Sequence, residues 1–290
     1  MFKGAFSAIV TPFRDGVVDE PALRELIEWQ IQEGIDGIFP CGSTGESATL
    51  THAEHEQIIK LAVQQARHRV PVLAGTGSNA TAEAIRLTAF AREAGADGAV
   101  LISPYYNKPT QEGIFKHYKM IAASADLPLI VYNIPGRTGS NILPETFARL
   151  CEIKNIVAVK ESSGSLDQIS DIRRLCGDRL EVLSGDDSLT LPIIALGGTG
   201  AISVLSNLMP REVHQLVTAA LENDYARARE IHYRLLPLMR ALFLESNPIP
   251  VKQALAYMGK CCTELRMPLT PMSPAPAERL RTAMKELRLV

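Results

Sequence analysis

The feature that most constrains the fold is a regular alternation of strand-like and helix-like segments. Short apolar runs bounded by glycine, proline or polar residues cover residues 5–12, 37–43, 71–77, 98–104, 128–135, 156–162, 180–186 and 200–207. Segments with helical periodicity lie between them, and the sequence GIDGI at 34–38 is echoed by GADGA at 95–99, where a helix pattern gives way to a strand pattern. Eight such units favour the α/β class and a parallel sheet closed into a (β/α)8 TIM barrel.

A doubly wound open sheet is the competing fold for this alternation. It usually has fewer strands and a glycine-rich phosphate loop after the first, and residues 11–15 (TPFRD) are not such a loop. Beyond residue 223 the pattern is helical only, at about 224–243, 250–258 and 276–287. We therefore predict a catalytic barrel over residues 1–223 and a C-terminal helical extension over residues 224–290 that packs on it.

Charge and composition exclude several classes of function. The chain has 290 residues and a formal net charge of -2, so it has no basic excess with which to hold nucleic acid or an acidic membrane surface. No apolar run approaches the ~20 residues of a membrane span, and the first residues show no signal-peptide pattern. The five cysteines include no CxxC pair, which favours reduced thiols and a cytoplasmic location.

The strongest candidate for chemistry lies in the segment 156–162 (IVAVKES), where four apolar residues lead to Lys160. Side chains alternate along a strand, so Ile156, Ala158 and Lys160 are expected to share one face, with Glu161 on the other. If that face lines a barrel, desolvation favours the neutral amine of Lys160, which can attack a carbonyl carbon. A solvated lysine at a strand end is the alternative. We expect no salt bridge between Lys160 and Glu161.

Neighbouring strand ends supply candidate partners, because active sites of this fold gather at the C-terminal ends of the strands. Residues 42–46 (GSTGE) offer two hydroxyls in a tight turn, either for an anion or for the turn itself. Tyr132 is expected to face inward beside Lys160, as a proton relay or as a structural tyrosine. Arg137 suits carboxylate recognition and would favour a neutral Lys160, unless it is simply solvated.

Two other groups of residues point to different chemistry. Residues 197–200 (GGTG) resemble a glycine-rich phosphate cradle. Asp186 and Asp187 could hold a divalent ion, but adjacent strand residues point in opposite directions and Asp187 can cap the next helix. His52 and His55 lie three residues apart without a third ligand. We expect no metal; a phosphate-binding barrel and a non-catalytic binding barrel stay open as alternatives.

The strand-end motifs together resemble those of the dihydrodipicolinate synthase family, which belongs to the pyruvate-dependent class I aldolases along with N-acetylneuraminate lyase. The likeness extends from residue 11 to residue 252. It is carried by the segments 42–46 (GSTGE), 103–108 (SPYYNK), 132–139 (YNIPGRTG), 159–162 (VKES) and 200–204 (GAISV). The resemblance implies condensation of pyruvate with L-aspartate 4-semialdehyde to 4-hydroxy-tetrahydrodipicolinate, on the diaminopimelate route of lysine biosynthesis, with no metal or organic cofactor.

The resemblance also assigns roles to single residues. Lys160 would form a Schiff base with pyruvate, whose carboxylate would be held by Ser43 and Thr44. The backbone near Gly185 and Ile202 would line that pocket.

Further roles concern proton transfer and the second substrate. Tyr132, Thr44 and Tyr106 match the proton-relay residues of the family, with Tyr106 entering from a neighbouring subunit. Arg137 matches the residue that receives the carboxylate of the semialdehyde. The family usually assembles as a homotetramer, a dimer of tight dimers.

Many members of the family are inhibited by lysine at the tight-dimer interface. Glu83 would offer a carboxylate to the ammonium group of this ligand, so sensitivity to L-lysine is expected. The residues that match the inhibitor site are Ser47, Ala48, His52, His55, Asn79, Glu83 and Tyr105.

One position departs from the family pattern. Residue 43 is serine where most synthases carry threonine, and GSTGE is closer to the sialic-acid lyases. The hydroxyl is kept, so pyruvate binding is still expected, and Arg137 with residues 105–107 (YYN) favours the synthase. A Schiff-base pyruvate lyase or aldolase that acts on a sugar acid or another 2-oxo acid is the alternative.

Overall fold

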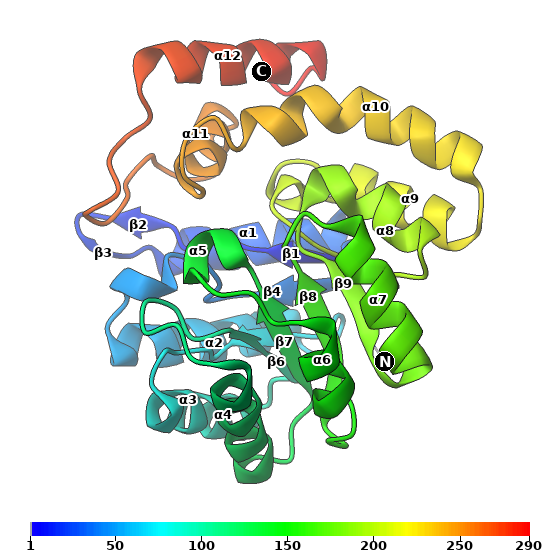
Figure 1. The fold of residues 1–290 in the computed structure, drawn as a ribbon. Coiled ribbons are helices and arrows are strands. Elements are labelled where there is room, and N and C mark those ends of the chain that lie inside the picture. Colours follow the sequence, from blue (N-terminus) through cyan, green and yellow to red (C-terminus); the bar gives the residue numbers. More distant parts are fainter. Residues whose placement is uncertain (1) are drawn as a thin grey trace.

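The computed structural model describes residues 2–290 and arranges them around one barrel of eight parallel strands (Figure 1). The barrel strands are β1 (Gly4–Ala8), β4 (Gly37–Phe39), β5 (Leu73–Gly75), β6 (Gly98–Ile102), β7 (Leu129–Asn133), β8 (Ile156–Glu161), β9 (Glu181–Ser184) and β10 (Gly200–Ser203).

The strands pair in the order β4-β1-β10-β9-β8-β7-β6-β5. A parallel bridge between Ile38 and Val72 joins the two end strands, and the amide of Gly75 donates to the carbonyl of Pro40 at 3.0 Å. The sheet is therefore closed, and the predicted TIM barrel is confirmed.

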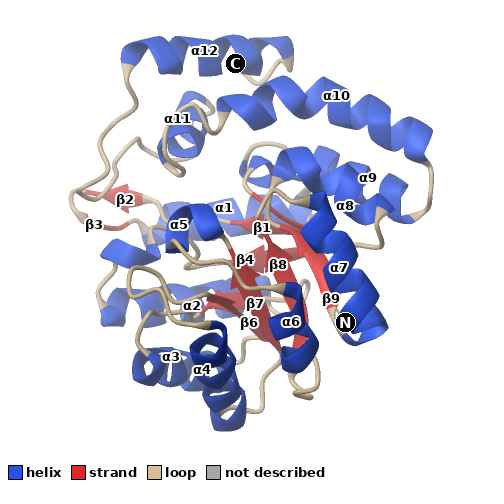
Figure 2. Ribbon diagram, in the orientation of Figure 1, coloured by secondary structure: helices blue, strands red, loops and turns tan. Residues whose placement is uncertain are grey.

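Helices surround the barrel on its outer side (Figure 2). They are α1 (Glu20–Gln32), α2 (His52–Ala66), α3 (Thr81–Glu93), α4 (Gln111–Ser124), α6 (Pro144–Leu150), α7 (Leu166–Cys176), α8 (Thr190–Ala195) and α9 (Pro210–Leu221). Thr51 and Glu54 form a capping box at the start of α2, since the Thr51 hydroxyl accepts from the Glu54 amide at 3.2 Å and the Glu54 carboxylate accepts from the Thr51 amide at 2.9 Å.

Shorter elements lie in the loops between these strands and helices. The hairpin of β2 (Phe13–Arg14) and β3 (Val17–Val18) and the one-turn helix α5 (Pro135–Thr138) follow two of the barrel strands. The 3-10 turns are η1 (Ser47–Thr49), η2 (Gly177–Arg179), η3 (Asp187–Leu189) and η4 (Leu205–Asn207).

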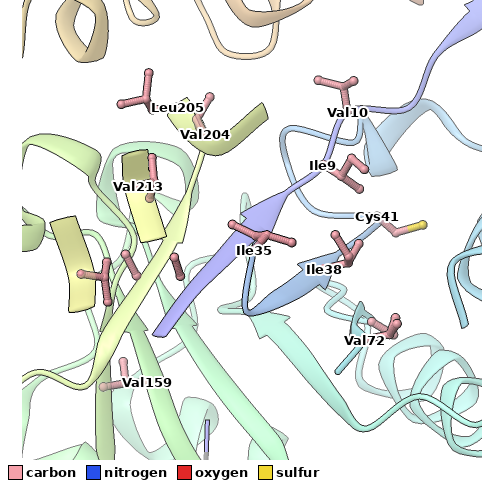
Figure 3. Packing of buried hydrophobic residues seen from close by; sticks show 14 of the residues in the cluster. Ile9, Val10, Ile35, Ile38, Cys41, Val72, Val159, Val204, Leu205 and Val213 are labelled. Carbon is pink, nitrogen blue, oxygen red and sulfur yellow. The ribbon is translucent and has the colours of Figure 1, made fainter. Parts of the chain in front are cut away.

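Apolar residues pack in two layers, as alternation along barrel strands requires. The inner layer contains Phe6, Ile130, Ala158 and Ile202. The outer layer, between strands and helices, contains residues such as Ile38, Val72, Val159 and Val213 (Figure 3).

Strand β8 departs from the simple alternation that the sequence predicts. The register pairs Leu129 with Ile156 but Ile130 with Ala158, so Val157 is an extra residue that forms a bulge. A bulge reverses the facing of the residues before it. Ile156 accordingly packs in the outer layer, and its predicted position on the face of Lys160 is wrong.

The predicted C-terminal helical part is confirmed. Helices α10 (Tyr225–Ala241), α11 (Ile249–Tyr257) and α12 (Pro274–Glu286) lie together along one side of the molecule (Figure 1). The division at residue 223 stays a prediction; it falls in the turn between α9 and α10. Among residues 2–290, no helix combines the length and apolar character needed to cross a bilayer.

A buried ion pair fixes this C-terminal part to the barrel. The Nζ atom of Lys252, on α11, lies 2.5 Å from Oε1 of Glu46 and donates to the carbonyl of Glu264 at 2.8 Å. Both charged side chains are almost fully buried, and the ring of Phe13 lies 4.2 Å from the ammonium. A buried pair of this kind fixes the relative position of the two segments, because separating its partners would leave charges uncompensated.

Candidate active site

Lys160 lies at the C-terminal end of β8, inside the barrel mouth. Its side chain is 5% exposed, and its Nζ atom lies 4.1 Å from the ring centroid of Tyr132 and 4.9 Å from that of Phe39. Burial lowers the pKa of this amine to about 7, and the positive charge of Arg137 acts in the same direction, while Asp187 opposes it. A substantial fraction of the amine is therefore neutral at physiological pH.

Glu161 points away from Lys160, as the alternation predicts. Its carboxylate is buried on the outer side of β8, where it accepts from the Asn133 amide at 3.1 Å, the Ser163 backbone amide at 2.6 Å and the Gln168 amide at 3.2 Å. Burial raises the pKa of Glu161. Within residues 2–290 no carboxylate forms an ion pair with Lys160, so its amine is free to react.

Tyr132 pairs with Lys160 in the β7–β8 register and is 5% exposed. Its hydroxyl lies near the side chains of Ser43 and Ser162, and burial raises its pKa to about 12. A phenol with this pKa keeps its proton until a reacting group takes it. The structure therefore brings Ser43, Tyr132 and Lys160 together, as predicted.

Gly185 lies next to the side chain of Lys160, and Ile202 lies in the inner layer of the barrel. Gly185 follows β9, and a Cβ atom on it would overlap Oγ of Ser162 and come within 3.0 Å of Cε of Lys160, so a larger residue would displace these two side chains. Ile202 is 1% exposed.

Thr44 and Arg137 are joined by a residue that the sequence reasoning did not single out. Asn247, between α10 and α11, donates from Nδ2 to Oγ1 of Thr44 at 2.9 Å, and its carbonyl accepts from Nη2 of Arg137 at 2.9 Å. Thr44 is 3% exposed. No periodicity marks Asn247, which lies in the stretch over which the family likeness extends to Lys252.

A cavity of about 480 Å³ opens at the C-terminal ends of the strands. Its walls include Phe39 and Tyr132, the two rings beside the Lys160 amine, together with Ser43, Arg137 and Asn247. A small keto acid fits a space of this size.

Tyr106 does not reach this cavity from its own chain. Its side chain is 89% exposed, and its backbone has a φ of 72°, in the left-handed region. The structure thus separates Tyr106 from Tyr132 and Thr44 within one chain.

The residues that match the inhibitor site lie at the outer part of the same cavity. Nε2 of His52 lies 3.4 Å from Oε1 of Glu83, and Nε2 of His55 donates to the carbonyl of Gly75 at 2.6 Å. The cavity-lining members of this set are Ser47, Ala48, His52, His55, Glu83 and Tyr105.

Asn79 reaches this group from the side. Asparagine is a common helix N-cap, but the amide of Asn79 donates to the carbonyl of Tyr105 at 3.2 Å, and Ala80 holds the N-cap position of α3. The seven residues are therefore neighbours.

Comparison with known proteins identifies the family. The family model of the dihydrodipicolinate synthetase family matches residues 1–287. The chain belongs to this family. The 4-hydroxy-tetrahydrodipicolinate synthase of Citrifermentans bemidjiense is 56% identical over 290 residues, which is 100% of both chains. The family resemblance seen in the strand-end motifs is confirmed.

Solved structures of dihydrodipicolinate synthases share the whole fold. A structure described as the first monomeric variant of this enzyme is 41% identical, with a TM-score of 0.98 over 100% of this chain and 98% of that one. The enzyme of Cyanidioschyzon merolae with lysine bound is 41% identical, with a TM-score of 0.97 over 100% and 99% of the two chains.

The glycine-rich loop that the sequence offers as an alternative phosphate site lies at the end of the barrel opposite the candidate active site. Residues 197–200 lead from α8 into the N-terminal end of β10, opposite Lys160. The backbone amides of Gly197, Gly198 and Thr199 already donate to carbonyls of the chain at 2.8–2.9 Å. An anion would have to compete with these bonds.

Asp186, and not Asp187, takes the capping role that the sequence predicts. The side chain of Asp186 accepts from the backbone amide of Ser188 and caps the next turn. Asp187 is buried and accepts from the backbone amides of Val204 and Leu205 at 3.0 and 2.9 Å. The predicted capping role of Asp187 is therefore wrong, because its side chain turns inward and anchors η4. Among residues 2–290, no cluster of three His, Cys, Asp or Glu side chains has metal-site geometry.

Proposed function

We propose that this chain condenses pyruvate with L-aspartate 4-semialdehyde to give 4-hydroxy-tetrahydrodipicolinate, the committed step of the diaminopimelate route to lysine, through a Schiff base on Lys160. The observation that carries the proposal is a buried amine with a pKa of about 7 beside two rings, Phe39 and Tyr132, that line a cavity, in a chain 56% identical to an enzyme of that name. A neutral amine is the nucleophile that carbonyl chemistry requires.

Pyruvate capture is the first step. The nitrogen of Lys160 attacks the keto carbon, and the resulting carbinolamine loses water to form the protonated Schiff base. The Tyr132 phenol, which lies near Ser43, donates the proton that the departing water needs. The hydroxyls of Ser43 and Thr44, with the backbone near Gly185, hold the pyruvate carboxylate.

Condensation follows from the Schiff base. Loss of a methyl proton gives the enamine, whose carbon attacks the aldehyde carbon of the semialdehyde, and the aldehyde oxygen takes up a proton. Arg137 receives the carboxylate of this substrate, as its exposed guanidinium at the cavity wall supports. The substrate amine then attacks the Schiff-base carbon, closes the ring and releases Lys160. These steps use no metal or organic cofactor.

The assembly that fits this mechanism is a homotetramer built from tight dimers, in which Tyr106 of one subunit completes the proton relay of another. The 89% exposure of Tyr106 supports this, because the side chain is available to a neighbour. Mixing Tyr106→Phe with Lys160→Ala subunits tests it: exchange should restore activity by placing an intact relay beside an intact lysine. No recovery in exchanged mixtures, or a fully active monomer on sedimentation, would contradict the proposal.

L-lysine is the proposed inhibitor, bound where His52, Glu83 and Tyr105 line the outer cavity. The lysine-bound relative from Cyanidioschyzon merolae supports this assignment. A lysine titration should lower activity, and Glu83→Gln should weaken the effect by removing the carboxylate that pairs with the ligand's ammonium. Flat activity up to millimolar lysine would reject it. The free thiols of all five cysteines, each within residues 2–290, support the proposed cytoplasmic location.

Reduction with borohydride tests the central claim. The enzyme incubated with pyruvate and borohydride should gain the mass of one carboxyethyl group, the reduced form of the Schiff base, and peptide mapping should place it on Lys160; the Lys160→Ala variant should gain none. An unmodified wild-type chain would refute the mechanism.

Arg137→Ala separates the synthase from the lyase alternative. It should lower kcat/KM for the semialdehyde by roughly a hundredfold, since a charged hydrogen bond contributes about 1.5–3 kcal/mol. Trapping of pyruvate should persist. If condensation were unaffected, a different acceptor substrate would be indicated.

A further inference from the structure

Asn247 makes two contacts that link residues with separate tasks in the proposed function. Its side chain is 6% exposed and donates to Oγ1 of Thr44, while its backbone carbonyl accepts from Arg137. Both distances are 2.9 Å. The side chain therefore acts on a relay hydroxyl, and the main chain acts on the group that receives the second substrate.

The direction of the first hydrogen bond matters for proton transfer. A threonine hydroxyl has one proton and two lone pairs, whereas an amide N–H can only donate. Because Asn247 donates to Thr44, the Thr44 proton cannot point toward Asn247 and is free to point toward another acceptor.

The opposite orientation of the amide is less favourable. With Oδ1 turned toward Thr44, the hydroxyl proton would be used by Asn247, and the buried Nδ2 group would lose the one partner that it has now. In the observed orientation Nδ2 keeps its partner, and Oδ1 is the buried side-chain atom of Asn247 that has no partner among residues 2–290. One unpaired acceptor costs less than an unpaired amino group with two donors.

We propose that Asn247 is a positioning residue that fixes the polarity of the proton relay, holding the Thr44 hydroxyl as a donor toward the reacting groups. This inference rests on the proposed function, and it adds a task for the C-terminal extension. The backbone contact to Arg137 does not depend on the side chain, so the two tasks can be separated by mutation.

Two substitutions test the polarity. Asn247→Asp keeps the shape but turns the donor into an acceptor, so the Thr44 proton is drawn away from the relay; kcat should fall by about a hundredfold. Asn247→Ala removes the donor and leaves the hydroxyl undirected, with a loss of about tenfold, the equivalent of one hydrogen bond. The KM for the semialdehyde should stay within about threefold in both, because the carbonyl still holds Arg137.

The pH profile supplies a readout that a purely structural role would not move. The added anion of Asn247→Asp should shift the acid limb of the rate profile to higher pH, since a nearby negative charge favours the protonated amine of Lys160. The Asn247→Ala profile should keep its midpoint. Asn155→Ala is the matched control: its amide bonds only to backbone carbonyls next to the N-terminal end of β8, and its loss should lower the melting temperature without changing kcat.

Pyruvate trapping distinguishes a failure of the proposed function from a failure of the positioning role. If wild-type enzyme forms no adduct, the proposed function fails. If wild-type and both Asn247 variants form the adduct but the variants keep kcat within twofold of wild type, the positioning role is wrong. Should Asn247→Ala fail to fold, the isosteric Asn247→Asp still decides. Dividing its rate by the number of sites that trap pyruvate removes any loss caused by misfolded protein, so the loss that is left reports on the positioning role.

Discussion

Pyruvate capture should depend on pH with a midpoint near the pKa of about 7 that burial gives Lys160. The shift from the ordinary value of 10.5 corresponds to ~5 kcal/mol in favour of the neutral form. At pH 7 roughly half of the amine is then neutral, compared with about one molecule in 3,000 for an unperturbed lysine. Burial therefore raises the fraction of neutral, reactive amine by roughly three orders of magnitude.

The assay is the initial rate of adduct formation with pyruvate and cyanoborohydride across about pH 5–10, measured by intact mass. The rate should rise through pH 7 as Lys160 loses its proton and then level off. Arg137→Ala should move the midpoint upward, because its positive charge helps to lower this pKa. The midpoint should stay well below 10.5, since burial is the larger cause. A wild-type midpoint above about pH 9, or a downward shift in Arg137→Ala, would refute the reasoning.

Three further predictions concern stability and proton transfer. Lys160→Met should raise the melting temperature at pH 6. The pKa of Lys160 is lower in the folded than in the unfolded chain, so the free-energy cost of burying its charge is complete below about pH 7 and disappears as the pH rises toward 10.5. Equal melting temperatures of the variant and the wild type at pH 6 would contradict this. Lys252→Met leaves Glu46 buried without its cation and should cost about 3–5 kcal/mol in urea unfolding, and Glu46→Gln added to it should recover most of the loss. Tyr132→Phe keeps the ring beside Lys160 but removes the relay hydroxyl. The value of kcat should fall by a factor of about 10²–10⁴, while the pH midpoint of pyruvate trapping should not change. A midpoint shift of more than one pH unit would argue against a relay role.

Much of the fold was predictable because the signals are local. Short apolar runs and strand–helix repetition identify all eight barrel strands, and parity places Lys160 and Tyr132 on the inner face. Strand-end position then brings Ser43 and Arg137 to the same cavity. Each of these inferences needs only a few neighbouring residues.

The unpredicted features depend on contacts between distant segments or on single backbone irregularities. The bulge at Val157 has no residue signature, so the face of Ile156 was predicted wrongly. Asp187 is an equally good helix cap by its chemistry, and only the position of the η4 amides turns it inward. Asn247 reaches Thr44 because α11 is held by the buried pair of Lys252, which no local pattern encodes.

The order in which the ribosome makes this cavity has a chemical consequence. Residues 246–248, 268 and 269 complete its wall, so they are translated long after Lys160. Until they arrive, the cavity next to the rings beside Lys160 lacks part of its wall, and a nascent chain should react poorly with the keto acids of the cell. Late completion of the pocket would thus protect an unfinished polypeptide from premature carbonyl modification.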